Sequence, residues 1–406
     1  MTAAERSSRW ARRFVFAGAV FLVCWQATVL LGGTRPTGVT LGLLGFVFHT
    51  IFGKAYSLVP TYFDRELATT RFMGVHLALS LSGTLLLAVD AEWGPAYAGT
   101  LGTTSWAAGV MVFLGTIFWT IRDNLTGTET ATGGVNVDRQ RVDRVANLFV
   151  PIALVYLAVG SYELLAIHAE VPPTAGLPGE ASLPLVFDGY GPRAMHLLAA
   201  GTGALLVFAI GFRLLPRFLV ASPPKPLVWV VLPAGAVAPL LLAVGLPDGR
   251  LFELGALLQS VAFAGFAVAF WVLYFRSDRR RVGFYGVLAC TVAGLLGVAL
   301  GLLFAFERVT ADLILAHLRL NVLGFLGLAI VGASYQFYPP AVGTFRGAGD
   351  RTALVAIGFL FSGLLVEVAA LVVDVGLGVI AGQTLGLVGA SLHVYLLAGL
   401  FHERYG

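Results

Sequence analysis

Long apolar segments separated by short polar breaks run along the whole chain. Crossing the hydrocarbon core of a bilayer takes about 20 mostly apolar residues in an α-helix, because each residue advances the helix by ~1.5 Å. Segments that meet this requirement cover residues 14–33, 36–60, 72–89, 98–121, 145–167, 192–215, 227–246, 251–275, 283–306, 310–338, 352–373 and 378–401. The pattern predicts an all-α integral membrane protein of about twelve transmembrane helices, numbered one to twelve below.

The composition agrees with this pattern. Of 406 residues, 58% are hydrophobic and 12% are charged, which excludes a set of soluble domains and favours one polytopic membrane domain over residues 1–406. The segment 14–33 has no small-residue cleavage site, so we expect it to be retained as helix one. Cys24 and Cys290 both lie inside predicted helices, which leaves neither a disulfide framework nor a CxxC metal site.

Basic residues fall in alternate breaks between the predicted helices. The net charge of +4 is therefore a topology signal, because positive charge gathers on the cytoplasmic side, and it indicates no nucleic-acid partner. We expect both termini to be cytoplasmic, with the lipid bilayer as the main partner. The basic breaks hold Arg6 to Arg13, Arg65 and Arg71, Arg122 to Arg144, Arg217 and Lys225, Arg276 to Arg281, and Arg346 and Arg351.

An internal repeat links helices two, six and ten. Helix two has glycines at 45 and 53, and helix ten has them at 324 and 332, within a pattern that repeats at a constant offset of 279 residues. Helix six carries the same spacing at Gly203 and Gly211. The twelve helices therefore divide into three pseudo-symmetric groups of four, roughly residues 1–122, 145–276 and 283–406. Recurrent glycine indicates close approach of a backbone to another helix or to a flat bound group.

Two histidines occupy the same place in this repeat. His196 and His317 each stand seven residues before the first glycine of their helix, Gly203 and Gly324, and the helix-two counterpart is Gly38. Seven residues is close to two helical turns, so each histidine shares a face with its glycine, in the predicted outer half of the bilayer. Two imidazoles at one depth suit a heme or a copper ion, while the alternative is a hydrogen bond to a neighbouring helix.

The remaining intramembrane histidines give weaker signals. His49 and His393 lie near mid-membrane on separate helices, where they could form a second metal site or bond to neighbouring helices. His76 lies near the cytoplasmic end of helix three. His168 and His402 stand at helix ends and are expected to be solvated.

Two charged residues fall inside predicted helices. Arg319 lies two residues after His317 and so points away from it, and it needs an anion, such as Glu307, Glu163 or the propionates of a bound heme. Glu367, in the middle of helix eleven, is either a protonated structural acid or a proton-relay group.

Helix ten, which reads HLRLNVLGFLGLAIVGASYQFYP from His317 to Pro339, resembles the tenth helix of heme-copper oxidase catalytic subunits of the cbb3 type. That family helix reads approximately His-x-His, four residues, Gly-Trp, then Phe-Gly-x-x-Tyr and Pro. Twelve helices in three groups of four, with helices two, six and ten at the centre, is also the architecture of that superfamily.

The resemblance implies a heme protein of a prokaryotic cell membrane, with heme b and possible copper as cofactors. His317 takes the place of the proximal heme ligand, with Arg319, Gly324 and Gly203 beside the cofactor, and His196 lies on the helix that supplies a copper ligand. However, Arg319 replaces the second histidine of the family pair. Helix seven has no histidine, and helix two lacks the low-spin heme ligand. The chain therefore resembles a divergent relative, closer in character to the NnrS family than to a working terminal oxidase.

Three hypotheses about function follow. The first is a heme-binding protein acting in electron transfer, nitric oxide handling or respiratory-complex maturation, with a redox partner or respiratory subunits as partners. The second is a transporter of a small solute, suggested by the repeats and by helices interrupted at Pro151, Pro233 and Pro239. The third is a cofactor-free scaffold subunit. A heme absorption spectrum separates the first hypothesis from the other two.

Overall fold

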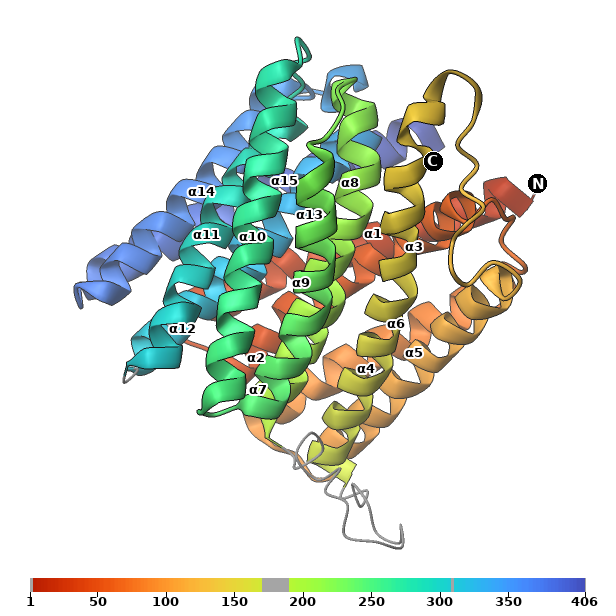
Figure 1. The fold of residues 1–406 in the computed structure, drawn as a ribbon. Helices are drawn as coiled ribbons and strands as arrows, with labels where there is room; N and C mark the ends of the chain where they lie inside the picture. Colours follow the sequence, from red (N-terminus) through yellow and green to blue (C-terminus); the bar gives the residue numbers. More distant parts are fainter. Residues whose placement is uncertain (1–2, 170–189, 308–309, 406) are drawn as a thin grey trace, which may run out of the picture. The chain divides into compact units, whose positions relative to one another are not determined.

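The fold, a computed structural model shown in Figure 1, is described for residues 3–169, 190–307 and 310–405. All regular structure in these ranges is helical, and twelve of the helices are long and apolar enough to cross a membrane. The predicted fold class, an all-α multi-pass membrane protein, is confirmed. The predicted segments 98–121 and 283–306 coincide at both ends with α5 and α11.

Nine of the crossing helices in the described ranges have a single α-helical segment. These are α1 (Ala3–Leu30), α4 (Met73–Trp93), α5 (Ala98–Ile121), α6 (Gln140–Ala169), α9 (Lys225–Gly245), α10 (Arg250–Arg276), α11 (Gly283–Phe306), α14 (Asp350–Val372) and α15 (Gly376–Tyr405). Short 3₁₀ turns, η2 (Gly134–Arg139) and η5 (Pro340–Val342), lie before α6 and after helix ten. Helices α6 and α9 continue through Pro151, Pro233 and Pro239, so these prolines do not break them.

The other three crossing helices are the repeat helices, and each contains a π-helical segment. Helix two consists of α2 (Arg35–Val39), η1 (Thr40–Phe48) and α3 (His49–Tyr62). Helix six consists of α7 (Gly191–Met195), η3 (His196–Ala204) and α8 (Leu205–Leu219). Helix ten consists of α12 (Ala311–Arg319), η4 (Leu320–Gly327) and α13 (Leu328–Phe337). Each π segment contains the first glycine of the repeat, Gly45, Gly203 or Gly324. The repeat therefore extends from the sequence to the backbone conformation. π turns are rare overall, but those that occur are often found at functional sites.

The chain divides into two compact units. One contains residues Met1–Trp10, Ala55–Arg213 and Lys225–Ala262, and the other contains Ala11–Lys54, Leu214–Pro224 and Phe263–Gly406. The second unit holds η1 and η4, and these two π segments pack together. A Cβ built on Gly327 would lie 3.2 Å from the Phe46 ring. Helices two and ten are therefore neighbours, as the repeat predicts.

Glycine sets the helix spacing inside the second unit. At Gly363 of α14, an added Cβ would lie 2.6 Å from the carbonyl oxygen of Gly382 and 2.8 Å from the amide nitrogen of Gly386 on α15. The two helices lie side by side in Figure 1. Backbone contact of this kind is the usual packing device between membrane helices, where small residues allow close approach.

Replacing Gly363 by alanine is expected to lower the free energy of unfolding by about 1–3 kcal/mol, because the added methyl group meets backbone atoms that cannot rotate away. Gly358 on the same helix is the matched control, since nothing lies within 4 Å of a Cβ built there. Thermal unfolding of the two alanine variants in detergent checks the prediction, and equal midpoints would contradict it.

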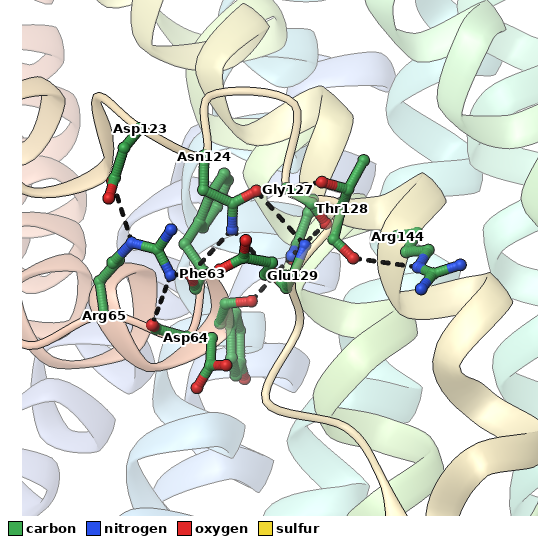
Figure 2. Close-up of polar contacts among 11 residues, drawn as sticks. Phe63, Asp64, Arg65, Asp123, Asn124, Gly127, Thr128, Glu129 and Arg144 are labelled. Carbon is green, nitrogen blue, oxygen red and sulfur yellow. Dashed lines mark hydrogen bonds and ion pairs between the residues drawn. The ribbon is translucent and has the colours of Figure 1, made fainter.

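Polar contacts tie the segment after α5 to residues 63–65, which follow α3 (Figure 2). Asn124 donates to the carbonyl oxygens of Phe63 and Glu129, at 2.9 Å each, and Arg65 forms ion pairs with Asp123 and Glu129. The hydrogen bond from Arg65 lowers the pKa of Asp123 below its usual value. This predicted cytoplasmic break is thus an ordered, turn-rich connection.

Candidate functional site

His317 lies near the start of helix ten and faces helix nine, α11. Its Nδ1 atom is 2.9 Å from the carbonyl oxygen of Gly297, and its ring centroid is 5.2 Å from that of Phe304. The imidazole also lies over Gly301, where an added Cβ would be 3.0 Å from Cε1. Helix nine therefore fixes the orientation of the ring with a backbone acceptor and a glycine surface.

The hydrogen bond to Gly297 selects one tautomer of His317. A carbonyl oxygen can only accept, so Nδ1 carries the proton and Nε2 carries the lone pair that can bind a metal. This arrangement is the usual support of a metal-ligating histidine, whose other ring nitrogen donates to a carbonyl or carboxylate. Asn321, one turn further along, donates to the carbonyl oxygen of His317 at 2.8 Å.

His196 has the same tautomer on helix six. Its Nδ1 is 2.8 Å from the carbonyl oxygen of Pro192, one turn earlier, so Nε2 again carries the lone pair. His196 stands five residues into its described helix and His317 stands six residues into its own, which matches the equal positions expected from the repeat. His196 belongs to the first compact unit and His317 to the second, and each is described within its own unit.

The repeat glycines are covered by protein side chains. A Cβ on Gly324 would lie 2.5 Å from the Ala293 Cβ and 2.8 Å from the Leu364 Cδ2, and one on Gly45 would lie 2.7 Å from the Phe21 ring. Gly203 is buried within η3. The sequence left helix contact and a flat bound group as alternatives for these glycines. At Gly45 and Gly324 the structure shows helix contact.

Arg319 forms an ion pair inside the membrane segment. Its Nε and Nη2 atoms donate to one carboxylate oxygen of Glu367, at 2.9 and 2.8 Å, and both side chains are almost fully buried. The other carboxylate oxygen accepts from Gln383 of α15 at 3.3 Å, and Nη2 also donates to Gln26 of α1 at 2.8 Å. The guanidinium carbon lies 4.8 Å from the centroid of the Trp25 ring.

These contacts answer two questions that the sequence left open. The counter-ion of Arg319 is Glu367, which the sequence analysis had not considered as its partner. Glu367 is therefore an ion-pair acid in this arrangement, with Gln383 as its second contact. A buried ion pair needs its remaining polar atoms satisfied to be stable, and the two glutamines contribute to this.

The other intramembrane histidines have partners within their own units. His393 Nδ1 is 3.1 Å from the Tyr335 hydroxyl, and His76 Nδ1 is 2.9 Å from the hydroxyl of Tyr56, the repeat counterpart of Tyr335. His49 Nδ1 lies 2.9 Å from the carbonyl oxygen of Leu44, in a π turn, with its ring among phenylalanines. The tyrosine partners were missed from the sequence, although the repeat marks both tyrosines.

In the described part of the chain, no group of three or more His, Cys, Asp or Glu side chains is arranged to hold a metal ion. A heme iron, in contrast, can be held by a single imidazole. A scan of protein-family models found no match, and a search of curated proteins found no similar sequence.

Proposed function

We propose that this membrane protein binds one b-type heme through His317 and serves in electron transfer, nitric oxide handling or the maturation of a respiratory complex. One observation carries the proposal. The hydrogen bond from His317 to the Gly297 carbonyl orients the imidazole and assigns its lone pair to Nε2. This histidine is also the residue that the resemblance of helix ten selects.

The ion pair at Arg319 supports one heme rather than two. Arg319 stands where the resembling family has its second histidine, and the space around it is taken by Glu367, Gln26 and Trp25. A guanidinium remains protonated and cannot bind iron. A heme held by one imidazole supplies a reducible iron with a position at which a diatomic molecule can bind.

In this proposal the chain's own residues orient and insulate the cofactor. The Gly297 carbonyl accepts the hydrogen bond from the ring nitrogen, and Gly301 and Phe304 limit rotation of the imidazole. Gly324 acts through helix packing, since Ala293 and Leu364 cover it. The incomplete copper ligands leave no basis for oxygen reduction as a terminal oxidase.

The absorption spectrum of the purified protein, with extraction of heme as the pyridine complex, tests the proposal. We expect a Soret band and b-type bands on reduction, with a stoichiometry near one heme per chain. Carbon monoxide or nitric oxide should shift the reduced spectrum if one coordination position is open. A protein purified from heme-sufficient cells with no Soret band would overturn the proposal and favour a transporter or a scaffold subunit.

A further inference from the structure

Three hydrogen-bond donors beside the buried ion pair have no acceptor among the described residues. They are the indole Nε1 of Trp25, the amide Nε2 of Gln26 and the guanidinium Nη1 of Arg319. All three side chains are at most 1% exposed. Buried polar atoms are normally hydrogen-bonded, and three exceptions of one chemical kind in one cluster need an explanation.

The three side chains are in contact with one another. Arg319 donates to Gln26 through Nη2, and its guanidinium lies over the ring of Trp25, the residue that precedes Gln26 on α1. Trp25 itself is fixed on helix two. The six-membered ring of its indole covers Gly42. The indole Nε1 atom lies 3.4 Å from a Cβ built on Gly38. The cluster is therefore held by helices one, two and ten.

The donors cannot be satisfied by rotation within the cluster. An indole N–H and a guanidinium can only donate. Turning the Gln26 amide would present Nε2 to Arg319 Nη2 and break the hydrogen bond that its Oε1 accepts. Gln383, the other glutamine, is bonded to Glu367. A group that accepts several hydrogen bonds is the chemical complement of these atoms.

The pairing geometry leaves the Nη1 donors of Arg319 for such an acceptor. Glu367 binds side-on, through Nε and Nη2, so that the Nη1 end of the guanidinium is directed elsewhere. Hydrogen bonds to an anion are stronger than those to a neutral acceptor, and a low-dielectric setting strengthens them further. A small anion can accept several hydrogen bonds at one atom, and so matches the chemistry of a set of neighbouring donors.

We propose that Trp25, Gln26 and Arg319 form a binding site for one small monovalent inorganic anion within the membrane segment. Arg319 stands eight residues into helix ten, about 12 Å from its predicted outer end at 1.5 Å per residue. Gln26 is four residues from the matching end of α1, which places the site in the predicted outer half of the bilayer.

This site is separate from the proposed heme site and does not depend on it. His317 and Arg319 are two residues apart on α12, and successive residues of an α-helix are turned by about 100°. His317 accordingly contacts Gly297 of helix nine, whereas Arg319 contacts helices one and eleven. Loss of heme binding would leave this proposal unaffected.

Chloride is the probe, and ³⁵Cl NMR line width of the full-length protein in zwitterionic nanodiscs is the measurement. We expect an excess line width that saturates with chloride concentration. Trp25→Phe keeps the ring on Gly42 and removes one donor, so it should weaken chloride binding about tenfold. Gln26→Glu should abolish the saturable component, because a carboxylate beside Arg319 takes the place of the anion.

Trp106→Phe is the matched control. Trp106 is also fully buried, but its Nε1 donates to the Ser161 hydroxyl at 3.2 Å in the other compact unit. This variant should bind chloride as the wild type does. A wild-type line width without a saturable component would mean that the donors meet water only, and would overturn the proposal. Equal chloride affinity in folded Trp25→Phe and Trp106→Phe proteins would do the same, and Gln26→Glu decides the question if Trp25→Phe does not fold.

Discussion

Replacing Glu367 by alanine is expected to cost about 3–5 kcal/mol of stability, the largest effect we expect from a single substitution in the second compact unit. The variant leaves the Arg319 guanidinium buried, at 1% exposure, without the carboxylate that now accepts two of its hydrogen bonds. In a buffer without small anions that could occupy the proposed Arg319 site, desolvation of the unpaired charge has no compensation in this environment. Thermal unfolding and the monodisperse yield after solubilisation measure the loss.

Two further variants separate charge pairing from packing. Gln383→Leu removes a single 3.3 Å hydrogen bond to Glu367 and should cost only about 1 kcal/mol. The double variant Arg319→Met with Glu367→Met replaces the ion pair by apolar side chains and should recover most of the stability lost in Glu367→Ala. A Glu367→Ala protein as stable as the wild type would show that Arg319 finds another anion.

The sequence predicted the membrane helices well because hydropathy is read over some 20 residues, which averages out local exceptions. Even the ends of helices four and nine were predicted to the residue. The glycine repeat was predictive too. Gly45, Gly203 and Gly324 mark the three π segments, although glycine spacing alone does not distinguish a π turn from an α turn.

The hydrogen-bond and ion-pair partners of buried polar side chains could not be predicted from the sequence. Arg319 and Glu367 are 48 residues apart, and nothing in local periodicity connects them. The choice depends on which faces of helices ten and eleven meet, where the Leu364 side chain packs over Gly324. For the same reason the sequence could not show that Ala293 and Leu364, rather than a ligand, cover Gly324.

The candidate site was likewise predicted only in part from the sequence. That His317 is unusual could be predicted from its register with Gly324 and from the helix-ten motif. Its tautomer could not be predicted, because this depends on the Gly297 carbonyl of a neighbouring helix. The sequence therefore selected the residue, and the packing of helix nine on helix ten supplies the argument for ligation.

In protein shown to carry heme, His317→Ala is expected to remove most of it, since the substitution deletes the proposed iron ligand. Gly301→Val is the sharper test of the site. Its added side chain begins 3.0 Å from His317 Cε1, so it must displace the imidazole while leaving Nε2 chemically intact. Disturbing the support of a ligating histidine typically costs 10–100-fold in metal affinity, and we expect a loss of heme affinity of about that size.

His402→Ala is the control, because His402 is an exposed histidine near the end of α15 and should leave the heme content unchanged. Wild-type heme content in folded His317→Ala would exclude His317 as the ligand. Heme affinity that survives in folded Gly301→Val would show that the orientation set by helix nine does not matter for binding.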